Sequence, residues 1–122
     1  MVTRRQEIVA LYDRELAGIE GLLTPPELPE GHESTHYFYW VQMSPEIRDQ
    51  VASDLLADEI YTTFRYAPLH KVPTYGTPDT RLPSSDWVSD RTLCLPLHPG
   101  LSDATCSPSP LPCARPSRPA PR

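Results

Sequence analysis

The sequence contains only one lysine, Lys71, among its 122 residues, and its net charge is −5. This acidic balance, without a basic stripe, argues against nucleic-acid binding. No apolar run approaches the ~20 residues that a membrane-spanning helix needs, so the sequence predicts no spanning segment. Residues 1–6 are charged but lead into an amphipathic pattern and not into a signal-peptide core, which argues against secretion by that route and favours a cytoplasmic protein.

Motifs for several kinds of active site are also missing. The sequence has no glycine-rich phosphate loop, no G-x-S-x-G and no obvious pair of catalytic carboxylates. Its three cysteines form an odd number without zinc spacing, so no disulfide framework is predicted, and Cys94 is expected to be a small buried side chain. His32 and His36 are four residues apart, but they flank the start of an expected strand and no further ligand completes a set. The sequence therefore predicts no metal site.

Proline, in contrast, is in excess, with 16 prolines in 122 residues against a usual ~5%. Six of them fall within residues 105–122, together with three arginines, two cysteines and no acidic residue. We therefore expect a small domain at residues 1–104 and a disordered Pro/Arg/Ser-rich tail at residues 105–122. The abrupt change in composition suggests a shifted reading frame near Ala104. Irregular Pro-x-Pro spacing argues against a tail that binds as an extended proline helix.

Residues 3–19 carry the pattern of an amphipathic helix. Thr3 and Gln6 have capping-box spacing, and apolar side chains then recur at helical intervals. Glycines and a run of prolines end the helix, so residues 24–33 are expected to form a surface linker. The expected buried face of the helix consists of Ile8, Leu11, Tyr12, Leu16 and Ile19.

Residues 34–43 are the strongest strand candidate. Both alternating faces of this segment carry aromatic rings, which favours a strand that is covered on both sides in the middle of a sheet. A second helix is predicted next, with Ser44 as its N-cap and Pro45 in its first turn. The expected buried face of this helix consists of Ile47, Val51, Ala52, Leu55 and Leu56.

The rest of the body is predicted to contain two further strands and a short helix. Residues 60–66 are rich in β-branched and aromatic side chains, which is typical of a strand, and residues 67–83 are irregular. A short helix is expected over residues 84–91 and a last strand over residues 92–97. This order of elements predicts the α+β class, with helices packed on a small antiparallel sheet.

Three residues near the end of the strand at 60–66 are candidates for binding a substrate: Arg65, Tyr66 and His70. Loops that leave strands often carry functional side chains, and arginine can hold a phosphate or carboxylate by paired hydrogen bonds. In the alternative interpretation, Tyr66 and His70 satisfy backbone groups of the loop and Arg65 is solvated. Lys71 lies in a proline-flanked loop with no acid nearby in the sequence, so we expect a surface role for it and not the anchoring of a cofactor.

Four segments follow one another in an order that is specific in combination. They are Arg4-Arg5 with Tyr12 and Leu16, then residues 36–41 (HYFYWV), residues 61–70 (YTTFRYAPLH) and residues 93–103 (LCLPLHPGLSD). In this order they resemble the C-terminal domain of the DegT/DnrJ/StrS family of sugar aminotransferases. The resemblance spans nearly all of residues 3–103, and the form of the third segment is most similar to members that act on nucleotide-linked ketodeoxysugars.

The resemblance implies a small domain of the aspartate-aminotransferase (type I) fold and pyridoxal 5′-phosphate as the cofactor. Members transfer an amino group, usually from glutamate, to a keto carbon of a nucleotide-diphosphate sugar, and they work as dimers with the active site between subunits. By position in the family motif, Arg65, Tyr66 and His70 would line or support the sugar-nucleotide side of that site. The implied partners are the nucleotide sugar and a large cofactor-binding domain or second subunit.

The departures from the family pattern concern the catalytic groups. The large domain, with its imine-forming lysine, has no counterpart in this sequence, so no catalytic residue is assigned. Glu59 occupies a turn where the family pattern favours glycine, a position that suits a positive φ angle. We therefore expect a transaminase fragment that is inactive alone. The alternative is a non-enzymatic module that binds a partner subunit through its exposed sheet and loop.

Overall fold

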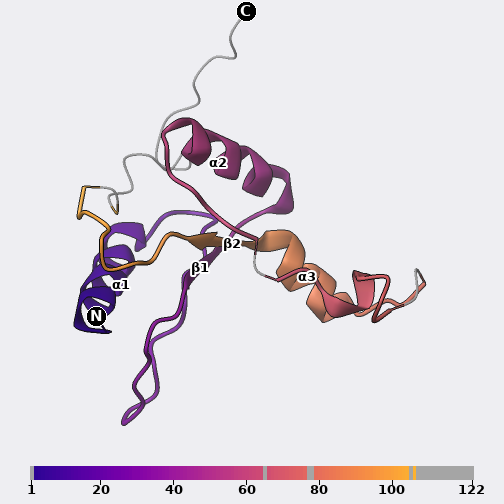
Figure 1. Ribbon diagram of the computed structural model, residues 1–122, viewed down its shortest axis with the longest axis horizontal. Helices are drawn as coiled ribbons and strands as arrows, with labels where there is room; N and C mark the ends of the chain where they lie inside the picture. Colours follow the sequence, from indigo (N-terminus) through magenta and orange to yellow (C-terminus); the bar gives the residue numbers. More distant parts are fainter. Residues whose placement is uncertain (1, 65, 77–78, 105, 107–122) are drawn as a thin grey trace, which may run out of the picture.

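The structure, a computed structural model, describes residues 2–64, 66–76, 79–104 and 106. Three α-helices lie around a small antiparallel sheet, and the segment that precedes the sheet runs out from this body and back (Figure 1). The described part of the chain is thus a small α+β unit. Its elements are α1 (Val2–Leu16), β1 (Tyr39–Gln42), α2 (Pro45–Ala57), the 3-10 helix η1 (Leu69–Lys71), α3 (Pro83–Arg91) and β2 (Thr92–Leu95).

Helix α1 confirms the predicted amphipathic helix and most of its buried face. Ile8, Tyr12 and Leu16 are buried in the core, and Leu11 and Ile19 pack against it from partly exposed positions. The helix ends at Leu16, before two glycines with positive φ angles that only glycine adopts without strain. The core continues from α1 into the sheet, the buried side of α2 and the turn at Leu101, where the guanidinium of Arg4 donates to the Leu101 carbonyl oxygen at 2.8 Å.

The sheet is built on the pairing of β1 with β2, in which Val41 lies opposite Leu93. A single bridge from Leu23 adds to the free edge of β1, and a single bridge from Thr63 adds to the free edge of β2. Strand β1 therefore lies inside a ladder four segments wide, as predicted for the aromatic strand. The outer two segments contribute only one bridging residue each.

The predicted strands are longer than the observed ones. The strand expected over residues 34–43 is reduced to Tyr39–Gln42, because His36 has a φ of 46° and its amide donates to the Ser34 hydroxyl at 3.0 Å. The expectation that both faces of this segment are covered is also wrong, since Tyr37 is 56% exposed and Phe38 is 40% exposed.

The strand expected over residues 60–66 contributes only the bridge at Thr63 among its described residues. It follows a turn in which Glu59 has a φ of 63°, as the family pattern indicates. Strand β2 ends at Leu95 and not at Leu97 because Pro96 cannot donate to a ladder.

Helix α2 confirms the second predicted helix, with Pro45 in its first turn. Val51 and Leu55 are buried, but Ile47 and Leu56 are exposed, so the predicted buried face was too wide. The hydroxyl of Ser44 donates to the Glu46 carboxylate and makes no side-chain hydrogen bond to the backbone of the first turn.

Helix α3 and strand β2 confirm the last two predicted elements, and Cys94 is buried, as expected. Cys106 is also buried in the core. The boundary predicted after residue 104 stays a prediction, because residues 105 and 107–122 lie outside the described residues. Among the residues that are described, no helix has the length and apolar character needed to cross a membrane.

Candidate functional site

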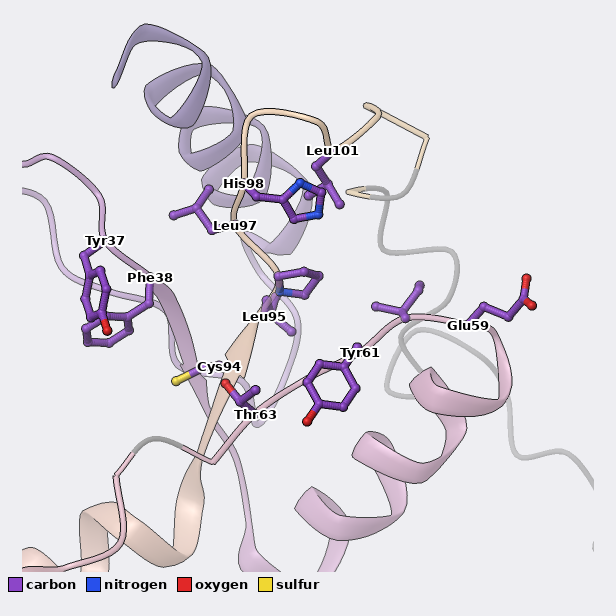
Figure 2. A pocket seen from close by; sticks show the side chains of 12 residues that line it. Tyr37, Phe38, Glu59, Tyr61, Thr63, Cys94, Leu95, Leu97, His98 and Leu101 are labelled. Carbon is purple, nitrogen blue, oxygen red and sulfur yellow. The ribbon is translucent and has the colours of Figure 1, made fainter. Parts of the chain in front are cut away.

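The first cavity opens beside the sheet and has a volume of about 400 Å³. Figure 2 shows the rings of Tyr37 and Phe38 on one side of it and the ring of Tyr61 on another. His98 adds an imidazole to the lining and Thr63 adds a hydroxyl. We call this space the sheet cavity. Its aromatic faces and scattered polar groups suit a ligand that is part apolar and part hydroxylated.

The second cavity lies between α2 and α3 and has a volume of about 710 Å³. Arg48 of α2 lines one side, and α3 contributes serines that include Ser84 and Ser89. The irregular segment that connects α2 and α3 in the sequence also lines this cavity, with Tyr66 and Lys71 among its residues. We call this space the helix cavity. It combines cationic groups, hydroxyls and aromatic rings.

Tyr37 and Tyr66 link the two cavities. The two tyrosine hydroxyl oxygens are 2.9 Å apart and share a hydrogen bond, although the residues are 29 positions apart in the sequence. Tyr37 lines the sheet cavity and Tyr66 lines the helix cavity. Sequence reasoning missed Tyr37 as a site residue because it was expected to be covered in the sheet. The only available signal was its place in the aromatic run.

The three residues predicted from the sequence have different positions. Arg65 lies outside the described residues. Tyr66 is 70% exposed at the helix cavity, whereas His70 is only 8% exposed and is not part of the lining of that cavity. The Nε2 atom of His70 is instead 3.0 Å from an Asp86 carboxylate oxygen on α3. The structure therefore places Tyr66 at the cavity and His70 outside its lining, where His70 contacts the side chain of Asp86.

Arg48 is a cation that sequence reasoning did not single out. Its guanidinium donates to the Ser89 carbonyl oxygen at 2.6 Å and to the Asp49 carboxylate at 2.8 Å. The same group lies over the Phe64 ring, 4.7 Å from the ring centre, in a cation–π contact. Arg48 thus connects α2 to α3 and to the segment of residues 60–66. A charge on a helix surface usually indicates a solvated side chain, so the sequence offered no signal for this role.

Lys71 is the only residue in the sequence that could form an imine with pyridoxal phosphate. Its Nζ atom is 2.6 Å from the Asp86 carboxylate, and the hydrogen bond raises the pKa of Lys71 while it lowers the pKa of Asp86. An imine-forming lysine has to lose its proton, but this ion pair retains it. Lys71 therefore does not fit the anchoring of the cofactor. The described residues also contain no cluster of three or more side chains suited to a metal ion.

A profile of the DegT/DnrJ/EryC1/StrS aminotransferase family matches residues 1–107. The chain belongs to this family. The membership confirms the resemblance carried by the four sequence segments. It also agrees with the fold, since solved aminotransferases superimpose on 86% and 87% of this chain.

Three family members illustrate the similarity. The dTDP-4-dehydro-2,3,6-trideoxy-D-glucose 4-aminotransferase of Saccharopolyspora spinosa is 58% identical over 103 residues, which are 84% of this chain and 26% of that protein. The aminotransferase TlmJ from Streptoalloteichus hindustanus is 50% identical with a TM-score of 0.81, over 86% of this chain and 28% of its own. Spr1654 of Streptococcus pneumoniae, a candidate sugar aminotransferase solved in PLP and PMP forms, is 28% identical with a TM-score of 0.77, over 87% of this chain and 28% of its own.

The chain spans about a quarter of the length of the family members that it matches. The cofactor forms of Spr1654 are those of pyridoxal phosphate and its amine. Family membership thus implies this cofactor, while the one lysine of the chain is unsuited to hold it.

Proposed function

We propose that this chain is the small-domain part of a pyridoxal-phosphate-dependent sugar aminotransferase. The complete enzyme transfers an amino group, from glutamate, to the keto carbon of a nucleotide-linked ketodeoxysugar. The observation that carries this proposal is the 58% identity with the S. spinosa 4-aminotransferase over 84% of the chain. We take the keto sugar nucleotide in the name of that relative as the first substrate to test.

In this function the chain supplies a wall that binds and orients the substrate, and the cofactor belongs to the rest of the enzyme. Tyr37 and Tyr66 offer phenol groups that can donate to or accept from sugar hydroxyls. Arg65 would lie on the sugar-nucleotide side of the site, as its place in the family motif implies, where a guanidinium can pair with a phosphate oxygen. We assign His70 the supporting role of holding the loop behind the cavity, because its imidazole contacts Asp86.

The partner in this function is a large cofactor-binding domain or a second subunit. Several of the side chains that line the two cavities are large, apolar and exposed, and exposed apolar surface supports contact with another protein. The residues in question are Tyr37, Phe38, Tyr61, Phe64 and Tyr66.

The proposal is tested with a chimera of the S. spinosa 4-aminotransferase in which residues 1–107 of this chain replace the matching segment. We expect the chimera to aminate the keto sugar with a kcat/KM within about tenfold of the parent, because the contacts that orient the substrate are retained. A chimera that folds and shows the parent's cofactor spectrum but has no turnover would contradict the proposal.

Tyr66→Phe in the chimera tests the assigned wall. We expect its kcat/KM to fall about tenfold through loss of one hydrogen bond, a change of about 1.4 kcal/mol. Tyr75→Phe is the matched control, because Tyr75 is equally exposed and lines neither the sheet cavity nor the helix cavity. Equal effects of the two substitutions on kcat/KM would contradict the assignment of Tyr66 to the substrate-binding wall.

The second candidate is a partner-binding module without turnover. It is favoured by the engagement of the one lysine with Asp86 and by the exposed aromatic surface. Mixing the purified chain with the S. spinosa enzyme lacking its matching segment separates the two. Restored amination supports the first function, and a stable complex without amination supports the second.

A further inference from the structure

His70, Lys71 and Asp86 form a cluster beside the helix cavity, and we assign no substrate contact to any of the three. One carboxylate oxygen of Asp86 lies 3.0 Å from Nε2 of His70 and 2.6 Å from Nζ of Lys71. Asp86 is in the first turn of α3, and the other two residues belong to η1, so the contacts join the irregular segment to the helix. Figure 1 shows this segment alongside α3. We call the three residues the Asp86 clasp.

The backbone around the clasp is folded tightly. The amide of Lys71 donates to the Pro68 carbonyl oxygen at 2.9 Å, and the amide of Gly76 donates to the Val72 carbonyl oxygen at 3.0 Å. A Cβ atom at Gly76 would meet the backbone of His70, so only glycine allows this close approach. His70 therefore lies within a compact loop whose N-terminal part lines the helix cavity.

The chemistry of Asp86 determines the proton position on His70. An ionised carboxylate has only acceptor atoms, so Nε2 of His70 has to carry the proton that it shares with Asp86. Lys71 adds a second donor to the same oxygen atom. Two further charged groups have opposite effects on the pKa of Lys71, since the charge of Asp90 raises it and the charge of Arg81 lowers it. Asp86 is thus the one acceptor in the cluster for two cationic or proton-bearing partners.

We propose that Asp86 is a positioning residue: its carboxylate holds His70 and Lys71 together against α3 and thereby fixes the segment of residues 66–76, the first part of which forms one wall of the helix cavity. Ala67, Pro68 and Lys71 of this segment line that cavity next to Tyr66. What the cavity binds rests on the proposed function, but the clasp is a property of this chain and is tested without any substrate.

The first test is amide hydrogen exchange by NMR on the full 122-residue chain. In Asp86→Asn, we expect the amides of Lys71 and Gly76 to exchange at least about tenfold faster, because an amide side chain cannot hold both partners. The amides of Val41 and Leu93 in the sheet are expected to keep their rates. The imidazole ¹⁵N spectrum should show a protonated Nε2 on His70 in the parent chain and a loss of this tautomer preference in Asp86→Asn.

Asp90→Asn is the matched control, because it removes the same charge from the same helix one turn later. We expect it to leave exchange in residues 66–76 within about twofold of the parent. If Asp86→Asn unfolds the whole chain, Lys71→Met replaces it as the test. This substitution removes only the ion pair between Lys71 and Asp86, so it should accelerate amide exchange in the loop alone. Loop exchange that is the same in Asp86→Asn and Asp90→Asn, or in Lys71→Met and the parent, overturns the proposal.

The second test uses the chimera described above. We expect Asp86→Asn to raise the KM for the nucleotide sugar about fivefold with kcat within about twofold, because the wall is displaced while the reacting groups remain. Asp86→Glu, which restores the charge, should recover most of the loss. An inactive chimera would contradict the proposed function and leave the exchange result on the clasp intact, whereas normal KM values in an active Asp86→Asn chimera would overturn the positioning role.

Discussion

Tyrosines occupy opposite environments in the core and at the two cavities. In the core, the rings of Tyr12 and Tyr39 pack 4.9 Å apart, and their hydroxyls donate to the Pro96 carbonyl and the Asp13 carboxylate. Burial raises the pKa of both phenols, so both stay protonated donors. At the cavities, Tyr61 and Tyr66 are about 70% exposed. The comparison teaches that aromatic content alone does not mark the core: the buried rings stabilise this chain, and the exposed rings line the cavities.

The largest expected effect separates two neighbouring leucines of α2. Leu55 is 2% exposed in the core and Leu56 is 59% exposed. Both lie in α2, so a change to alanine alters the intrinsic helix propensity by the same small, favourable amount at each position. We expect Leu55→Ala to lower the free energy of unfolding by about 2–5 kcal/mol, because it leaves a cavity. Leu56→Ala should change it by about 0.5 kcal/mol or less. Urea denaturation of both variants provides the measurement, and equal losses would show that the exposed side also stabilises the fold.

A smaller effect on stability is expected at Glu59, which lies in the turn between α2 and the segment of residues 60–66. Its φ of 63° is costly for a residue with a Cβ atom. Glu59→Gly should therefore stabilise the chain by about 1 kcal/mol in thermal or urea unfolding. Glu20→Gly is the control, because Glu20 lies in a turn without a positive φ, and it should destabilise slightly. A loss of stability in Glu59→Gly would mean that the Glu59 side chain stabilises the fold by more than its positive φ angle destabilises it.

The smallest effect concerns the pH dependence of the clasp. The hydrogen bond from Lys71 holds the pKa of Asp86 below its usual range, so the stabilisation is complete above the unfolded-state pKa. It is lost as the pH falls through the lower, folded-state pKa. The difference in urea midpoint between the parent and Asp86→Asn should therefore shrink toward zero between about pH 6 and about pH 2. A difference that stays constant over this range would assign the effect of the substitution to packing and not to charge.

The sequence predicts the helices of this fold better than its strands. Apolar spacing is local, so Ile8, Tyr12 and Leu16 could be placed on one buried face before any partner was known. Strand length depends on what pairs with the strand. Thr63 pairs with Cys94 through a single bridge, and no local pattern around residue 63 reports how far that pairing extends.

The candidate site was predicted only in the parts that the family motif names. Tyr66 and His70 were singled out, but the contacts that hold the surrounding segments together come from distant elements. Arg48 bonds to Ser89 across 41 positions, and His70 bonds to Asp86 across 16. Such partners become visible only when the helices are packed, because an isolated charge on a helix has the same pattern whether it is solvated or paired.

Lys71 is the one lysine of the sequence, so the Asp86 clasp can be probed by chemical labelling of its amine. An amine-acylating reagent has one side-chain target in the entire sequence, and acylation removes the charge that pairs with Asp86. The rate of labelling at this position follows how often the ion pair opens. The mass increment on the peptide that contains Lys71, timed against ligand or partner, therefore records the state of the loop without any engineered reporter.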